Sequence, residues 1–527
     1  MYAESIDTLF ERYGPVYKWL AAATCMLGGM TAILASSTVN VAFPDIMGTF
    51  GIGRDQAQLL STGFFASMTA GMLLSAWLID WLGERLSYSV ALVLFLLGAA
   101  MSGTAQNPEI LMSGRVLQGT AAGIIQPLTM AVVFKVFPKG RKGMSMGIYS
   151  MGMVLAPTLG PTAGGFAIEY FNWRYAFLLT LPSISLAFIL GNLFMPSRVW
   201  SKTIPPFDFL GFGFLAGGLF CYMIGFSYGQ RLGWGSNDIV ELFAAAVILT
   251  ICFILRQLYG PNPLINLKLF MIPQFTAAAL IALLTGCAFL ASTFMLPLFV
   301  QQIQQYSPME AGMMMIPGGL SLLIMFPVAG RLADALPPQV LIYAGLISFS
   351  LAFVFLARAD VNTPFWSLVS FTLLIRAGTA FTRPVINSTA LQAVPQALVN
   401  QGSGAINFMR QLGAAMGTSL LVVFLERRIP FHSDAFAAAQ TGAGGFSLAT
   451  QGQLTQILGE AGVPEALREP GALHHFSSMI YAQASTNGFQ DTFLALAFVS
   501  IVGVIPAGVM ALMKHRPAPP ISLSVAK

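Results

Sequence analysis

Hydrophobic residues are gathered into long segments along this chain, and short polar stretches separate one segment from the next. A helix needs about 20 apolar residues to cross a bilayer core of roughly 30 Å, because each residue adds 1.5 Å. The segments are continuous rather than alternating, which excludes a transmembrane β-barrel and predicts an all-α integral membrane protein. About fourteen transmembrane helices are predicted, at about residues 18–42, 56–79, 86–105, 109–134, 143–168, 174–195, 208–229, 238–258, 274–300, 310–334, 339–358, 364–390, 400–425 and 489–514.

The composition supports a membrane protein. Of the 527 residues, 56% are hydrophobic and 9% are charged, whereas soluble domains have about 25% charged residues. The four cysteines lie in apolar segments, without the paired spacing of metal ligands. We therefore expect neither a metal nor a cofactor, and a transport protein instead of an enzyme. The net charge of +5 is attributed to basic loops and not to nucleic-acid binding.

Lysine and arginine residues are unevenly distributed between the loops on the two sides. With the N-terminus inside, most of them fall in cytoplasmic segments, and long external loops count little in the positive-inside rule. We therefore expect a multi-pass protein of a bacterial inner membrane with both termini in the cytoplasm. No signal peptide is visible, and residues 1–17 are expected to form a short amphipathic helix on the cytoplasmic surface.

Two similar stretches suggest an internal repeat. Ala76-Trp-Leu-Ile-Asp80 follows the second predicted span, and Gly330-Arg-Leu-Ala-Asp334 follows the tenth. Many secondary transporters are built from repeated halves. We expect a six-helix half at 18–195, two inserted helices at 208–258, a second six-helix half at 274–514, and a cytoplasmic tail at 515–527. The long connection at 426–488 is expected to lie outside the cytoplasm.

Charged side chains inside the spans call for a reason, because each costs at least about 2.5–3.5 kcal/mol in hydrocarbon. Arginines within spans either hydrogen-bond to carbonyl groups between helices or serve transport. Arg115 and Gln118 are three residues apart and share one helix face. The acidic residues lie near span ends, which leaves few candidates for a proton carrier. The arginines are Arg115, Arg376, Arg383 and Arg410.

Small residues recur in the fifth span. Gly152, Ala156, Gly160 and Gly164 are spaced four apart and form one flat helix face. Two prolines in the same span, at 157 and 161, each remove a backbone donor and bend the helix. The face either packs within a helix bundle or forms a smooth interface between two halves that rock against each other.

Several motifs identify a family. Gly160-Pro-Thr-Ala-Gly164-Gly165 resembles the antiporter motif in the fifth helix of the major facilitator superfamily, and Arg115-Val-Leu-Gln-Gly119 resembles its fourth-helix motif. Trp173-Arg-Tyr-Ala-Phe177, followed by Leu181-Pro182, is similar to a stretch of the fourteen-span drug:proton antiporters of the EmrB/QacA type. With further matches such as Val39-Asn-Val-Ala-Phe-Pro44, the resemblance covers about residues 20–515.

The resemblance implies a major facilitator fold, with two six-helix halves and two inserted helices, and a proton-coupled secondary exporter of small amphipathic compounds. It implies gating or coupling roles for Arg115, Asp80 and Asp334. The antiporter motif is expected to supply packing positions at Gly152, Pro157, Gly160, Pro161, Gly164 and Gly165. The substrate cavity is expected to be lined by Asn40, Gln118, Gln126, Phe289, Thr293, Phe294, Arg376, Asn407 and Arg410.

Two departures from the family pattern change what is expected. The first helix has Ala35 where the family has an acidic residue, which removes a proton carrier. The loop after the second span lacks one or two of the usual basic residues, which weakens the charge lock of the outward-facing state. Two alternatives therefore remain. One is export of anionic substrates, such as an aromatic acid, a siderophore or a lipid, and the other is a non-pumping assembly or sensing subunit.

The resemblance also implies a partner. Exporters of the EmrB type in double-membrane bacteria work with a membrane-fusion adaptor, which must grip something outside the bilayer. The connection at 426–488 is long for a chain whose other external loops are short. We expect it to dock a periplasmic adaptor, and the alternative is a flexible cap over the outer opening.

Overall fold

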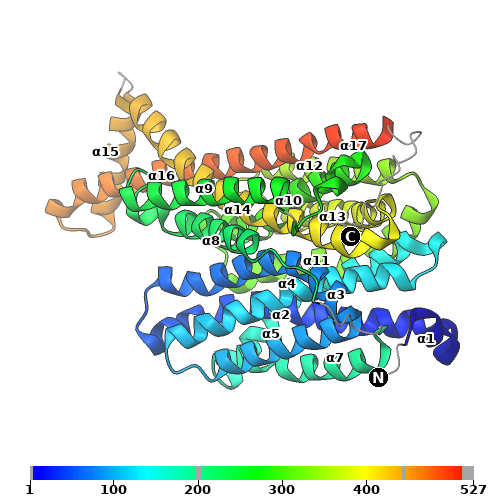
Figure 1. Cartoon of the computed structure of the whole chain (residues 1–527). Coiled ribbons are helices and arrows are strands. Elements are labelled where there is room, and N and C mark those ends of the chain that lie inside the picture. The colour runs from blue at the N-terminus through cyan, green and yellow to red at the C-terminus, as the bar shows by residue number, and fades with distance from the viewer. Residues whose placement is uncertain (1–3, 198–203, 261, 442–444, 513–527) are drawn as a thin grey trace.

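The computed structural model describes residues 4–197, 204–260, 262–441 and 445–512. Within these residues the chain forms helices and no strand, and the helices run side by side in one elongated bundle (Figure 1). In this part of the chain, twelve helices are long and apolar enough to cross a membrane. One of the twelve covers two predicted spans and α5 is not among them, so the count is compatible with fourteen. The predicted all-α membrane fold is confirmed.

The first group of helices contains the segments that precede the inserted pair. Its longest helix, α3, reverses direction at Gly83, where φ is 80°, a value that glycine adopts without strain. The predicted spans at 56–79 and 86–105 are therefore two legs of one element. The group comprises α1 (Ile6–Tyr13), α2 (Tyr17–Phe50), α3 (Arg54–Gly103), α4 (Pro108–Val136), α5 (Lys142–Tyr170), α6 (Tyr175–Leu178) and α7 (Thr180–Phe194), with 3-10 turns η1 (Gly14–Val16) and η2 (Lys139–Arg141).

The inserted pair, α8 (Phe209–Leu232) and α9 (Asn237–Tyr259), packs together and lies against α3 and α14. Its base is held by buried Asp208, which pairs with Arg256 at 3.0 Å. The second group comprises η3 (Leu267–Met271), α10 (Pro273–Gln302), α11 (Pro308–Ala335), α12 (Pro338–Leu356), α13 (Phe365–Ala393), η4 (Gln396–Leu398), α14 (Val399–Thr441), α15 (Gly445–Glu460), α16 (Glu465–Val502) and α17 (Val504–Leu512). The predicted tail at 515–527 lies outside the described residues.

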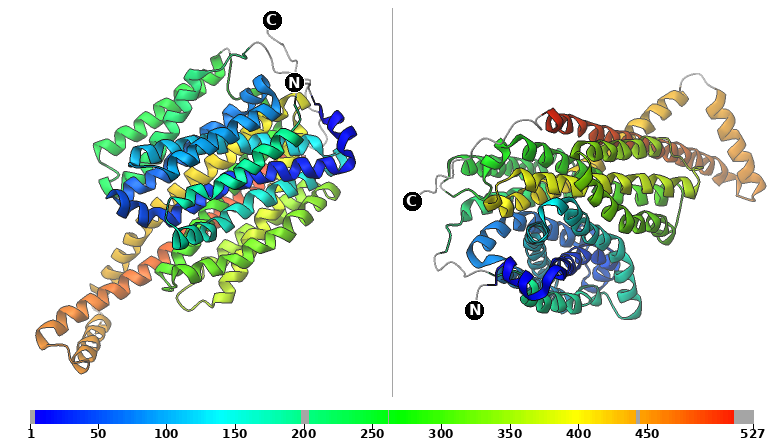
Figure 2. Two further views of the ribbon diagram at one scale, coloured as in Figure 1. Left: turned by 90° about the horizontal axis from the view of Figure 1, so that it is seen from below. Right: turned by 90° about the vertical axis from the view of Figure 1, so that its right-hand side faces the viewer.

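The bundle has two distinct ends. α1 and α17 lie at one end, which we call the basic end because Arg85, Lys135 and Lys142 are there, and α15 projects from the other, the hairpin end (Figure 1). At the basic end one apolar cluster combines both groups, with Phe137 from the first and Leu398 from the second. At the hairpin end the apolar clusters of the two groups are separate. Figure 2 shows the groups as two sets of helices lying against each other. Their apolar clusters indicate that they are joined mainly at the basic end.

The described part of the connection at 426–488 is largely helical. α14 continues to Thr441, and α16 begins at Glu465, so two membrane helices extend beyond the bundle, and α15 packs on α16 as a third arm (Figure 2). Residues 426–441 contain one proline, Pro430, and otherwise favour continuation of the helix. Polarity marks where a helix leaves the membrane but not where it ends, so the span predicted to end near residue 425 continues as a helix to Thr441.

Candidate functional site

A cluster of polar side chains lies where α13 and α14 meet the first group. Arg410 on α14 donates a 2.8 Å hydrogen bond to Oδ1 of Asn407, one turn earlier on the same helix, and another bond to Oδ1 of Asn387 on α13. Asn407 donates to the carbonyl of Ser403 and to the sulfur of Met130 on α4, at 2.9 and 3.0 Å. The last contact crosses between the groups, so the cluster belongs to their interface.

Arg383 completes this cluster. It lies one turn before Asn387 on α13. Its guanidinium is near enough to Arg410 for the two positive charges to repel each other, and it also lies near Tyr149 on α5. In the described part of the chain, Nε of Arg383 and Nδ2 of Asn387 are buried without a hydrogen-bond partner. An unsatisfied buried donor costs about 1–3 kcal/mol, which a ligand with acceptor atoms would offset. We call Arg383, Asn387, Asn407 and Arg410 the central cluster.

An aromatic ring on α10 faces the two arginines of α13. The guanidinium groups of Arg376 and Arg383 lie 5.1 and 5.9 Å from the ring centroid of Phe289. The hydroxyl of Thr293 donates to the carbonyl of Phe289 at 2.9 Å, so its own helix satisfies it. Phe294 is 48% exposed and lies on the surface of α10. Of the predicted cavity residues on α10, Phe289 is therefore the one placed beside the arginines.

From the first group, α4 and α5 face this region. The hydroxyl of Tyr149 donates to the backbone carbonyl of Gln126 at 3.1 Å. The side-chain amide of Gln126 is directed to the sulfur of Met68 on α3, at 3.8 Å, and so stays within the first group. The side chain of Asn40, also predicted to line the cavity, lies outside what the structure describes.

Arg115 lies inside the first group and away from the central cluster. It is fully buried, and Nη1 donates to Oε1 of Gln118 at 3.2 Å and to the carbonyl of Ala35 at 3.1 Å. Nε donates to the carbonyl of Leu60 at 3.3 Å, and the ring centroid of Phe64 is 4.2 Å away. Arg115 thus ties α4 to α2 and α3. One acceptor is the carbonyl of Ala35, the position where the family has an acidic residue.

None of the buried arginines is neutralised by an acid. Among the described residues, Arg115, Arg376, Arg383 and Arg410 form no ion pair with a carboxylate. Arg115 instead bonds to backbone carbonyl oxygens and to Gln118 and lies over the ring of Phe64. Arg410 bonds to the side-chain oxygens of Asn387 and Asn407. The three arginines of the second group, Arg376, Arg383 and Arg410, therefore make its side of the interface electropositive.

The basic end carries polar contacts between the groups. Asp334, at the end of α11, accepts hydrogen bonds from the backbone N–H groups of Gly143 and Met144 in the first turn of α5, at 2.6 and 2.9 Å. Free N–H groups and the helix dipole make that turn a favourable partner for a carboxylate. Lys135 bonds to Glu84 at 2.9 Å and to Oδ1 of Asn400 on α14 at 2.8 Å. The contacts of Asp334 with α5 and of Lys135 with Asn400 therefore join the two groups at this end.

Asp80 and its neighbours lie on the first-group side of the same end. Asp80 is half-buried on the first leg of α3, one turn before Gly83. Arg85, in the stretch that departs from the family pattern, bonds to Glu4 at 2.6 Å and to the carbonyl of Met195 at 2.8 Å. Arg85 therefore fastens the N-terminal segment, and Lys135 supplies the basic contact to the second group.

The small-residue face of α5 packs against α2 within the first group. A Cβ atom added at Gly152 would meet Met26, at Gly160 it would meet Ser37, and at Gly164 the backbone of Thr38. The alternative that this face forms the interface between the halves is therefore wrong. α5 meets α11 through residues nearer its start, where Gly143 and Gly147 approach Gly330.

Gly165 and Pro157 are the other described positions of the motif. A Cβ atom added at Gly165 would meet nothing within 4 Å, so its assignment as a packing position is wrong. Pro157 is half-buried in a helix that continues from residue 142 to 170. The side chain of Pro161 lies outside the described set.

A polar cluster that was not predicted from the sequence lies at the hairpin end. Oδ2 of Asp491 on α16 accepts from Nε of Arg428 on α14 at 2.6 Å and lies 2.7 Å from Nε2 of His432. Arg428 and His432 are one turn apart, which is a signal visible in the sequence. Their partner, Asp491, lies about sixty residues later in the chain, and residue spacing alone does not reveal that the three side chains meet. This cluster joins α14 to α16 inside the second group.

Comparisons with known proteins agree with this architecture. The sequence model of the Major Facilitator Superfamily matches residues 25–418. The lincomycin resistance protein LmrB of Listeria monocytogenes is 27% identical over 404 residues, which cover 77% of this chain and 86% of the relative. The multidrug export protein EmrB of Haemophilus influenzae is 28% identical over 405 residues, 76% of this chain and 79% of the relative.

A solved structure shares the fold. The proton:xylose symporter XylE, bound to 6-bromo-6-deoxy-D-glucose, superposes with a TM-score of 0.60 at 13% identity, over 94% of this chain and 95% of that chain. The motifs of the fourth and fifth helices, the paired helix groups and the family match all lead to one assignment. This chain is a multi-pass membrane transporter that belongs to the major facilitator superfamily.

Proposed function

We propose that this protein exports small amphipathic compounds across a bacterial inner membrane by proton-coupled alternating access. The observation that carries the proposal is the uneven interface, in which the two groups share an apolar cluster at the basic end and have separate clusters at the hairpin end. Rocking about such an interface would expose the central cluster to each side in turn. LmrB and EmrB, whose names describe resistance and multidrug export, support the direction of transport.

The proposed orientation places the basic end in the cytoplasm. The positive-inside rule supports it, because Lys135, Lys139 and Lys142 lie there. The contacts of Asp334 and Lys135 then form an inner gate, and Asp80 belongs to the same end. Arg115 is assigned a positioning role, since it holds α2, α3 and α4 together through carbonyl groups.

The proposal is tested with purified protein in proteoliposomes under an imposed pH gradient. One cationic dye and one aromatic acid are the probes, each measured with the gradient, without it and with an ionophore that collapses it. Gradient-dependent movement of either probe supports the proposal. If a probe moves equally fast after the gradient collapses, proton coupling is contradicted. If neither probe moves although the protein keeps its thermal unfolding transition, the non-pumping alternative is favoured.

A second candidate function is export of anionic amphiphiles. It is favoured by Arg376, Arg383 and Arg410 at the interface, which no carboxylate neutralises in the described part of the chain. A ligand carboxylate would find a charged partner there and the unsatisfied Nε of Arg383. Arg383→Gln should then weaken export of the aromatic acid about tenfold or more and leave the dye unaffected. Equal losses for both probes would contradict selectivity for anions.

We also propose that the projecting arm, residues 426–488, docks a periplasmic adaptor. Several large apolar side chains of the arm are exposed, among them Phe431, Leu473 and Tyr481. Apolar groups held outside the bilayer on long helices would suit a helical partner. Removing residues 436–480 and joining the ends with a short Gly/Ser linker should leave transport in proteoliposomes intact and abolish co-purification with the adaptor. Co-purification by the shortened protein would contradict the docking role.

A further inference from the structure

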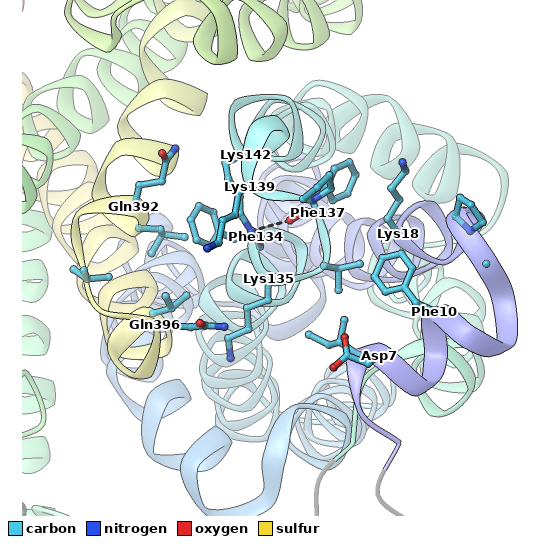
Figure 3. A pocket seen from close by; sticks show the side chains of 18 residues that line it. Asp7, Phe10, Lys18, Phe134, Lys135, Phe137, Lys139, Lys142, Gln392 and Gln396 are labelled. Atoms are coloured by element: carbon cyan, nitrogen blue, oxygen red, sulfur yellow. Dashed lines mark hydrogen bonds between the residues drawn. The ribbon is translucent and has the colours of Figure 1, made fainter.

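A groove of about 890 Å³ lies at the basic end, between the N-terminal segment and the junction of the two groups (Figure 3). Its walls come from α1, the start of α2, the end of α4, η2 and the start of α5 on one side. The end of α13, η4 and the start of α14 form the other side. The groove is thus outside the central cluster and is built by both helix groups.

The charges in the groove are strongly unbalanced. Four lysines line it, Lys18, Lys135, Lys139 and Lys142, and Asp7 is the one acidic residue among the lining positions. Lys135 is already held by Glu84 and Asn400. Lys142 turns back to the carbonyls of Phe134 and Phe137, at the end of α4. In the described part of the chain, Lys18 and Lys139 form no ion pair, so they remain able to bind an anion.

The rest of the lining is apolar. Phe134, Phe137, Leu391 and Val394 are buried among the lining side chains, and we call these four residues the floor of the groove. Phe10 of α1 also lines the groove and lies across it from Phe134 (Figure 3). A small hydrated anion would gain nothing from such a floor. An anion joined to an apolar chain would use both the lysines and the floor.

The level of the groove relative to the membrane also restricts which ligands it can bind. Lys18 is the second residue of α2, and Lys135 is the last but one of α4, so both lie where membrane helices reach the headgroup layer. Lysines at that level attract anionic headgroups, by about 1 kcal/mol each in the general case. The rim is also fixed in place, because Glu4 before α1 pairs with Arg85 at 2.6 Å and bonds to Ser197 at 2.9 Å.

We propose that this groove binds the phosphate headgroup of an anionic phospholipid. Lys18 and Lys139 contact the phosphate, and the upper part of the acyl chains lies over Phe134 and Phe137. Gln392 and Gln396 approach from the second group (Figure 3). A lipid that contacts both groups favours the arrangement in which the basic end is closed, because that arrangement alone brings the two walls together.

The test uses the full-length protein in detergent and short-chain lipids. Native mass spectrometry counts bound dihexanoyl phosphatidylglycerol and dihexanoyl phosphatidylcholine, with inorganic phosphate as a competitor. The double variant Lys18→Gln/Lys139→Gln is compared with Arg141→Gln/Arg331→Gln. The control pair removes the same charge from exposed positions at the same end that do not line the groove.

The wild-type protein and the arginine control should prefer the anionic lipid about tenfold or more, and the lysine variant should lose that preference. Equal binding of the two lipids by the wild type overturns the proposal. So does an equal loss in both double variants, which would indicate a diffuse charge effect. Displacement of the lipid by equimolar inorganic phosphate would also overturn it, because the site would then recognise a free anion. Both lysines are at least partly exposed, so their replacement should leave the thermal unfolding transition unchanged.

Discussion

The two ends of the bundle hold their helices together in different ways. At the basic end, polar contacts run between the groups, from Asp334 to the first turn of α5 and from Lys135 to Asn400. At the hairpin end, the polar contacts seen among the described residues join helices of the same group. Trp173 bonds to Thr49 at 3.0 Å in the first group, and Arg428 bonds to Asp491 in the second. A contact within a group can last through a transport cycle, whereas one between groups must form and break. Under the proposed cycle, location and not residue type therefore separates structural from gating side chains.

The largest effect is expected from a contact within a group. Arg115→Ala removes three hydrogen bonds that join α4 to α2, to α3 and to Gln118. At roughly 0.6 kcal/mol for each hydrogen bond inside a membrane bundle, the loss is about 2 kcal/mol. Transport should fall below detection, while a folded and less stable protein remains in the membrane. Transport in proteoliposomes and thermal unfolding in detergent are measured on the same preparation. Transport at the wild-type rate by this variant would contradict a positioning role for Arg115.

A leucine at the contact between the groups should act differently. A Cβ atom at Gly330 would lie 2.9 Å from the carbonyl oxygen of Gly143, so Gly330→Leu cannot close the basic end. Transport should fall at least about tenfold, and labels on the two groups should report a basic end that stays open, without a large loss of stability. The matched control is Gly165→Leu, in open space on α5, which should transport normally. A normal cycle in Gly330→Leu would contradict the assignment of this contact to the gate.

The spans and the partner of Arg115 could be predicted from the sequence, and the family resemblance named Asp334, but the partner of Asp334 on α5 could not be predicted. Twenty-residue apolar segments locate helices because bilayer thickness sets their length, and Arg115 meets Gln118 because three residues bring two side chains to one face. Asp334 meets Gly143, 191 residues away, and only the packing of α11 on α5 brings the two together. The sequence likewise shows the small-residue face of α5, but not that α2 covers it.

A smaller effect is expected when the gate loses one charge. Asp334→Asn keeps the shape of the side chain and weakens its bonds to the N–H groups of Gly143 and Met144. Because Asp334 is exposed, we expect the free-energy difference between the closed and open basic end to change by about 1 kcal/mol. The ratio of open to closed molecules should then rise roughly fivefold. Distance distributions between spin labels on α5 and α11 measure it. Arg331→Gln, one turn earlier on α11, should leave the distribution unchanged, and a shift of the same size there would refute a specific role for Asp334.

The smallest effect concerns the N-terminal segment. The hydrogen bond from Arg85 and the charges of Arg85 and Arg12 lower the pKa of Glu4 below its usual 4.5. The folded-state pKa is the lower one, so this contact stabilises the segment above pH 4.5, and its contribution is lost as the pH falls through the folded value. Relative to the intrinsic exchange rate of free amides, which itself falls with pH in this range, hydrogen exchange of α1 should therefore accelerate on acidification below pH 4.5. Glu4→Gln should exchange at the faster rate at all pH values, and an unchanged acid response in that variant would assign the effect to another group.

The continuous helices of the projecting arm act as a lever. α14 has 43 residues, a length of about 65 Å at 1.5 Å per residue, and only its first part lies within the bundle. Because α14 and α16 belong to the second group, a rotation of that group by about 10° would carry the tip of the arm through roughly 8 Å, given a lever of about 45 Å. Small changes at the buried interface are thus amplified into a displacement that any protein touching the arm would sense directly.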